Sequence, residues 1–154
     1  MADWIMNRVN FNFYKEEDYK EFKEFVKSDT LDFDFYEIVK PPQGEYTPEE
    51  LNSWYSDNWG CKPRLDGGYS SIQDNFKFRD SNLTQYGYSC DVTFRTPYSP
   101  PIGIFMKLFK TFFNKDKNQM RWHFFSESNH YCYGYLEQEM DLERFMEEEN
   151  KNGI

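Results

Sequence analysis

Few residues in this chain have the types and spacing that chemistry would need. The two histidines, His123 and His130, lie seven residues apart, and Cys132 follows closely. A metal site or a nucleophilic centre would need at least a third ligand or a base converging on them. Side-chain alternation along a strand places His123 with Arg121 and Phe125, which is typical of a structural histidine. We therefore expect no catalytic residue, no metal site and no cofactor.

Three carboxylates, Asp32, Asp34 and Glu37, could be considered as an acid pair for general acid–base work. They alternate with apolar residues in a short segment, a pattern that favours solvated surface positions. We interpret them as surface residues and expect the protein not to be an enzyme.

Aromatic residues beside turns are the stronger candidates for a binding site. Asn58-Trp59-Gly60 follows an expected helix, and the turn Thr96–Pro101 contains Tyr98 and Ser99. In one interpretation Trp59 packs into the core, and Asn58 ties loops together at the helix end. In the other, both segments border a concave site that stacks a base or nucleotide. The further rings of that site would come from an alternating stripe: Tyr131, Tyr133 and Tyr135.

The net charge is −9, and acid is concentrated towards the end of the sequence. This balance disfavours direct nucleic-acid binding, which depends on Lys and Arg, and it disfavours anionic membranes. An acidic surface can instead meet a basic protein surface, including one built to hold DNA. The alternative is that the charge only aids solubility. The segment 137–149 contains one base, Arg144, among these acids: Glu137, Glu139, Asp141, Glu143, Glu147, Glu148 and Glu149.

Length and composition favour a single domain over residues 1–154 with a core built from rings. Aromatic residues make up 21% of the chain, with 16 Phe, 12 Tyr and 4 Trp, and rings bury a large area per side chain.

Three widely spaced cysteines, Cys61, Cys90 and Cys132, indicate a reducing compartment. The amino terminus lacks a signal-peptide pattern, and the most apolar window, 102–113, is too short to span a bilayer. We expect a cytoplasmic protein.

Hydrophobic periodicity predicts alternating strands and helices around a central strand that ends in a proline-rich turn. Thr47-Pro48-Glu49-Glu50 has the residues of a capping box and starts a helix. The whole order indicates an α+β protein with one largely antiparallel sheet and helices on one face. The predicted elements are strand 9–13, helix 16–27, an edge strand or ordered loop over 31–38, a helix from 47, a polar insertion over 63–85, strand 86–94, helix 102–113, a hairpin of 120–126 with 131–137, and helix 141–150.

Several segments together resemble the YubB ferredoxin-like domain family of plasmid and phage proteins. They span residues 4 to 137 in the family's order, although Cys61, Pro63 and Tyr98 differ from its usual residues. The resemblance implies a ferredoxin-like sandwich and an origin in a mobile element, but no known activity. The matching segments are Trp4 with Asn7, Asp32-Phe33-Asp34-Phe35 with Pro41, Asn58-Trp59-Gly60-Cys61-Lys62, Phe94–Pro101 and the strand around Gly134.

These observations lead to one functional hypothesis and one alternative. The hypothesis is a non-enzymatic phage or mobile-element accessory protein that binds a host protein with a basic surface. That host protein would be a nucleic-acid-binding defence component, inhibited in an anti-CRISPR-like or DNA-mimic-like way. The acidic residues Glu137, Glu139, Asp141 and Glu143 would meet its basic patch, and the tyrosines would supply anchors. The alternative is a module that binds or sequesters a small molecule such as a nucleotide.

Overall fold

The computed structural model describes residues 4–62, 87–114 and 118–126, together with the backbone of 79–80 and 133–136. In this part of the chain, no helix is both long enough and apolar enough to cross a membrane. The elements in chain order are β1 (Trp4–Phe13), α1 (Glu16–Val26), α2 (Phe35–Ile38), α3 (Pro48–Asn58), β2 (Arg79–Asp80), β3 (Tyr88–Pro97), α4 (Ile102–Leu108), the π-helical turn η1 (Phe109–Phe113), β4 (Gln119–Ser126) and β5 (Tyr133–Leu136).

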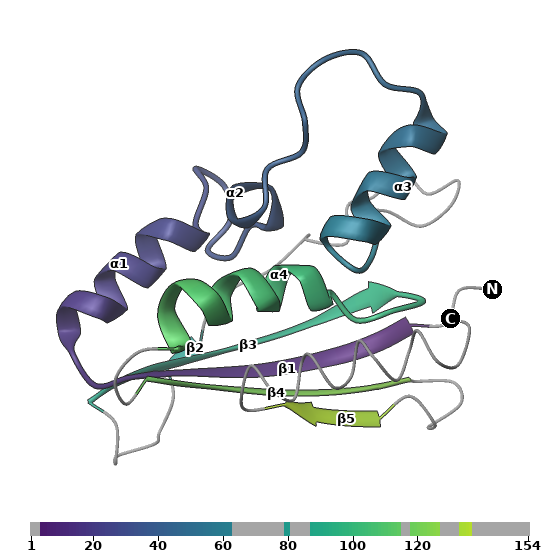
Figure 1. Cartoon of the computed structure of the whole chain (residues 1–154). Coiled ribbons are helices and arrows are strands. Elements are labelled where there is room, and N and C mark those ends of the chain that lie inside the picture. Colours follow the sequence, from purple (N-terminus) through teal and green to yellow (C-terminus); the bar gives the residue numbers. More distant parts are fainter. Residues whose placement is uncertain (1–3, 63–78, 81–86, 115–117, 127–132, 137–154) are drawn as a thin grey trace.

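One antiparallel sheet carries the fold, with the strand order β2-β3-β1-β4-β5. The long strand β1 lies in the middle, so that Val9 is opposite Val92 on one side and Trp122 on the other. The four α-helices lie on one face of this sheet (Figure 1). The predicted α+β architecture is confirmed, as is the pairing of the two strands β4 and β5.

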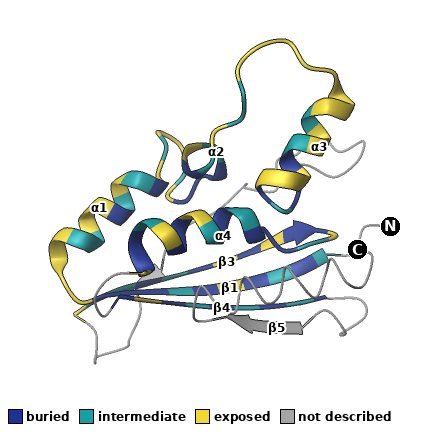
Figure 2. Ribbon diagram, viewed as in Figure 1, coloured by how far each residue is buried: buried dark blue, intermediate teal, exposed yellow. Residues whose placement is uncertain are grey.

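The two faces of the sheet differ as strand alternation requires. In β1, Ile5, Val9 and Phe11 point to the helices and are buried, whereas Arg8 is exposed on the other face. The same division runs along β3, where Val92 is buried and Arg95 is exposed. Burial is thus concentrated between the sheet and the helices (Figure 2).

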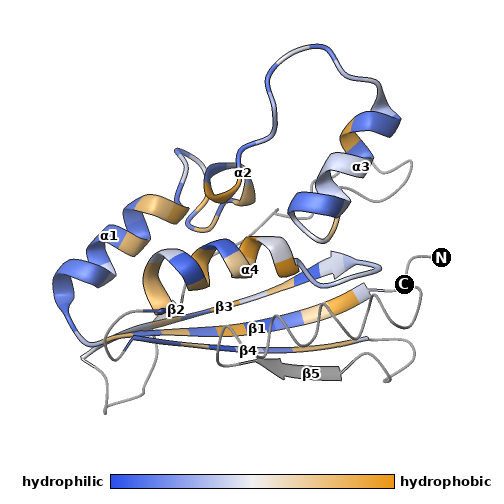
Figure 3. Ribbon diagram, in the orientation of Figure 1, coloured by the Kyte–Doolittle hydropathy of each residue, from blue (hydrophilic) through white to orange (hydrophobic). Residues whose placement is uncertain are grey.

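The helix α4 lies directly against the sheet, and it is the most apolar of the helices (Figure 3). Its buried residues include Ile104, Phe105 and Leu108, and Lys107 is exposed. The prediction of a largely buried helix from residue 102 is confirmed, with a π-helical last turn that buries Phe112 and Phe113. Ring packing then joins the layers, since the centroids of Phe105 and Trp122 are 4.3 Å apart.

The second half of the segment 31–38 is a correction to the sequence prediction, because residues 35–38 form the short helix α2, whereas residues 31–34 form a loop. The side chain of Asp34 caps α2 by accepting a hydrogen bond from the Tyr36 N–H at 2.9 Å. Phe35 and Ile38, three residues apart, are both buried. A single helical turn satisfies both the cap and this spacing, so local capping decided against the alternating pattern. The predicted helix 141–150 and most of the predicted insertion lie outside the described residues.

A buried polar residue sits inside this aromatic core at the centre of the sheet. Asn7 is fully buried, and its Oδ1 accepts a hydrogen bond from the Trp122 indole N–H at 3.0 Å. Its Nδ2 donates to the Thr96 hydroxyl at 3.1 Å and to the Ile5 carbonyl at 3.2 Å. Asn7 therefore links β1 to both neighbouring strands, and every bond it makes is to a group that is itself buried or partly buried.

Replacing Asn7 by Ala should lower the free energy of unfolding by about 2–4 kcal/mol, because the Trp122 N–H and the Thr96 hydroxyl lose a partner in a dry environment. Urea unfolding of the wild type, Asn7→Ala, Trp122→Phe and the double variant measures this. The cost of Asn7→Ala should be smaller in the Trp122→Phe background. Strictly additive costs would show that the two side chains do not interact.

Candidate functional site

The end of α3 and the turn before α4 form a tight joint. The Gly103 N–H donates to the Trp59 carbonyl at 3.0 Å. The Ser99 hydroxyl donates to the Gly60 carbonyl, and the Thr96 hydroxyl donates to the Ser99 carbonyl at 2.8 Å. The two segments that the sequence singled out therefore do come together, but through direct backbone contact.

Two glycines make this approach possible. A Cβ atom on Gly103 would lie 1.9 Å from the Asn58 carbonyl oxygen, far inside van der Waals contact. Gly60 has a φ of +88°, and a Cβ there would lie 2.7 Å from the Ile102 nitrogen. Only glycine fits both positions without moving the backbone. The joint is packed and leaves no room for a ligand between its two segments.

Trp59 packs into the core as the first interpretation predicted, but the Asn58 side chain bonds within its own helix instead of tying loops together. The Trp59 ring is fully buried, and its indole N–H donates to the Val39 carbonyl at 2.8 Å. The Asn58 amide donates to the Trp54 carbonyl at 2.9 Å, at the end of α3. The Trp59 ring is therefore not accessible for stacking on a base or nucleotide.

Tyr98 differs from its neighbours, because its ring is 51% exposed and its φ is +67°. The Ser99 N–H donates to the Pro97 carbonyl at 2.8 Å, closing a three-residue turn around Tyr98. A positive φ in such a turn is the strained form for a residue with a side chain. The protein thus holds one exposed aromatic ring in an unfavourable backbone conformation beside the joint.

The remaining predicted site residues are placed only in part. In the backbone register of β5, Tyr133 lies opposite Phe125 and Tyr135 lies opposite His123. The other predicted residues lie outside the described part of the chain: Tyr131, Glu137, Glu139, Asp141 and Glu143.

Among the described residues, no group of three His, Cys, Asp or Glu side chains could hold a metal ion. The His123 ring lies 5.9 Å from the Phe125 ring, on the same face of β4. Asp34 caps α2, and the Glu37 carboxylate lies 3.9 Å from the Lys40 ammonium. Burial raises the pKa of the Cys61 thiol, which opposes a role as a nucleophile.

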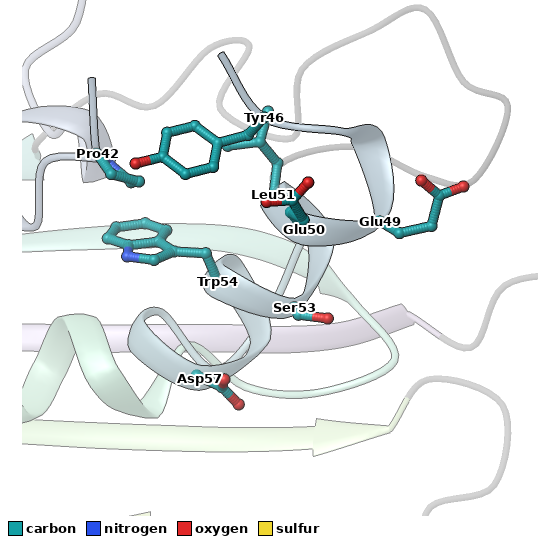
Figure 4. A pocket seen from close by; sticks show the side chains of 8 residues that line it. All are labelled: Pro42, Tyr46, Glu49, Glu50, Leu51, Ser53, Trp54 and Asp57. Atoms are coloured by element: carbon teal, nitrogen blue, oxygen red, sulfur yellow. The ribbon is translucent and has the colours of Figure 1, made fainter. Parts of the chain in front are cut away.

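A groove that sequence reasoning missed lies between α3 and the loop that precedes it. Its lining includes Pro42, Tyr46, Leu51 and Trp54, and its volume is about 500 Å³. In Figure 4 the Tyr46 and Trp54 rings lie on opposite sides of the opening, with Pro42 at one end. We call this feature the Tyr46–Trp54 groove.

The start of α3 fixes the geometry of this groove. The Thr47 hydroxyl accepts a hydrogen bond from the Glu50 N–H at 3.1 Å, and the Glu50 carboxylate accepts one from the Thr47 N–H at 3.3 Å. The predicted capping box is therefore confirmed. Because Tyr46 immediately precedes the cap and Trp54 lies within the helix, the cap holds the two rings relative to each other.

Exposed carboxylates are gathered in the part of the sequence that forms the groove, between Lys40 and Lys62. Residues 41–61 contain Glu45, Glu49, Glu50 and Asp57 but no Lys or Arg, and all four acids are exposed. The joint occurrence of uncompensated acid and spaced aromatic residues was visible in the sequence. Neither feature specifies that the two rings face each other, which depends on the cap at Thr47.

Comparison of the chain with protein-family models, curated proteins and solved structures finds no match.

Replacing Gly103 by Ala should destabilise the protein by about 2 kcal/mol or more, since a side chain there must push α3 away from α4. Gly87→Ala is the matched control, because nothing lies within 4 Å of a Cβ at Gly87. Thermal and urea unfolding of both variants measure the difference. Equal stability of the two would contradict the close approach of Asn58 to Gly103.

Replacing Tyr98 by Asn should leave the protein as stable as the wild type, or stabilise it by up to about 1 kcal/mol, because Asn tolerates a positive φ and an exposed ring contributes little packing. Urea unfolding is the measurement, and Tyr88→Asn is the control, since the partly buried Tyr88 ring packs 5.9 Å from Tyr19. A large loss of stability in Tyr98→Asn would mean that the ring contributes to the fold.

Proposed function

We propose that this chain is a non-enzymatic binding protein that recognises a basic surface of another protein. The observation that carries the proposal is the exposed acid of α3 and its preceding loop, four carboxylates with no base among residues 41–61. Charge complementarity of this kind speeds association and selects partners by sign. The exposed rings of Tyr46 and Tyr98, 42% and 51% accessible, supply anchors of the type that interfaces favour.

The proposal also includes the genetic origin of the protein and the kind of cell protein that it binds. The resemblance to the YubB ferredoxin-like family supports a ferredoxin-like sandwich and an accessory role in a phage or other mobile element. The described strand order and single helical layer are compatible with that fold. A cytoplasmic host protein that normally holds nucleic acid would present a basic surface of the required kind, and a host defence component is one such protein.

The nucleotide-binding alternative has less support. The site proposed for it needed an accessible Trp59, and that ring is fully buried. The one open groove described above carries three carboxylates, Glu49, Glu50 and Asp57, which would repel phosphate groups.

The test is co-purification from host lysate with the full chain, washed at low and high salt. We expect a retained protein with a basic surface that is released by salt, because attraction between exposed charges is screened. The variant Glu49→Gln/Asp57→Asn should retain less of it than the control Glu17→Gln/Glu21→Gln, which removes the same charge from α1.

A parallel variant, Glu137→Gln/Glu139→Gln/Asp141→Asn/Glu143→Gln, separates the contribution of the carboxy-terminal acids. Failure to retain any salt-sensitive partner would count against the proposal. Equal losses in the α1 control and the α3 variant would show that only net charge matters.

A further inference from the structure

The Tyr46–Trp54 groove has a chemistry that fits one kind of group, and we propose that it binds an arginine side chain on the partner's surface. This inference rests on the proposed function and deepens it, because it names the group that the acidic face recognises. Every side chain that it uses lies in the described part of the chain.

The walls of the groove suit a flat cation. Tyr46 and Trp54 present rings on two sides, and Pro42 closes one end (Figure 4). A guanidinium is planar and weakly hydrated, so it stacks on aromatic faces more readily than an ammonium does. A volume of about 500 Å³ accommodates one long side chain with its flanking backbone.

The charge of the groove has the matching sign. Glu49, Glu50 and Asp57 line it, and no basic side chain does. The Glu50 carboxylate accepts a hydrogen bond from the Thr47 N–H at 3.3 Å, which fixes its position at the start of α3. A cation in the groove lies nearest the Glu50 carboxylate, while Glu49 and Asp57 point away from the two rings and act from a greater distance (Figure 4). A neutral group of the same shape gains only the ring contacts.

The rings are also held in place before a ligand arrives. Trp54 packs edge-on against Tyr55 and Trp59, with ring centroids 5.4 and 6.4 Å away. Trp59 is anchored in turn by its bond to the Val39 carbonyl. Because one wall is fixed by the core and the other adjoins the helix cap, little side-chain freedom is lost on binding.

The experiment uses three five-residue peptides that differ only in a central arginine, lysine or citrulline. Citrulline has nearly the same shape as arginine but no charge. Nitrogen-15 NMR of the full chain reports the tryptophan indole N–H signals, assigned by single Trp→Phe variants. We expect the Trp54 signal to shift with the arginine peptide and not with citrulline. The indole groups of Trp59 and Trp122 are bonded internally and serve as references.

The affinities of three variants for the arginine peptide identify the side chains that contribute to binding. Tyr46→Ser should weaken arginine-peptide binding about twofold to fivefold, the range for an exposed cation–aromatic contact. Glu49→Gln/Asp57→Asn should weaken it as well, and Glu17→Gln/Glu21→Gln should leave it unchanged. An absent Trp54 shift, equal binding of citrulline, equal binding of a lysine peptide, or an unaffected Tyr46→Ser variant would each overturn the assignment to arginine.

The inference and the proposed function fail in different ways. If the full chain retains a salt-sensitive partner and Tyr46→Ser retains it equally well, the groove is not the contact and the assignment is overturned while the proposed function stands. If the arginine peptide binds as expected but no salt-sensitive partner is retained, the assignment is supported while the proposed function falls.

Discussion

One buried amide, that of Asn7, connects the centre of the sheet to the joint at the end of α3. The Trp122 indole and the Thr96 hydroxyl bond to Asn7, Thr96 donates to the Ser99 carbonyl, and Ser99 reaches the Gly60 carbonyl. This chain of hydrogen bonds runs from the middle of the sheet to the end of α3. Because a buried polar group without a partner is costly, the core admits only the arrangement that completes the chain. Burial of the aromatic core drives folding, and the chain of hydrogen bonds selects one packed arrangement of that core.

The same physics explains what could be predicted from the sequence. Helix 16–27, the capped start at Thr47, the strand through Val92 and the apolar helix from 102 all follow from periodicity and local capping, which act over a few residues. The α2 turn was missed because its cap at Asp34 competes with an alternating pattern in the same segment. The close approach of Gly103 to Asn58 could not be predicted, since it joins residues 45 positions apart.

The candidate site shows the same limit more sharply. Asn58, Trp59 and Ser99 have chemically versatile side chains, yet each makes a structural bond in this fold: Asn58 within α3, Trp59 to the Val39 carbonyl and Ser99 across the joint. Tyr46 and Trp54 were unremarkable in the sequence and become a groove only after the cap at Thr47 sets their relative position. A residue's type therefore indicated what it could do, whereas long-range packing decided whether it was accessible.

The described charged residues are distributed unevenly between the sheet face and the side of α3. The sheet face opposite the helices carries Arg8, Arg95 and Arg121 on the long strands, against the single carboxylate of Asp91. Asp91 accepts a hydrogen bond from Asn10, and Arg95 lies 5.6 Å from the Trp4 ring. The described charges therefore differ between the two sides: three arginines and one aspartate lie on this face of the long strands, whereas four exposed carboxylates lie on α3 and its preceding loop. Under the proposed function, the exposed carboxylates of α3 would attract a basic partner, which favours its approach from the side of α3.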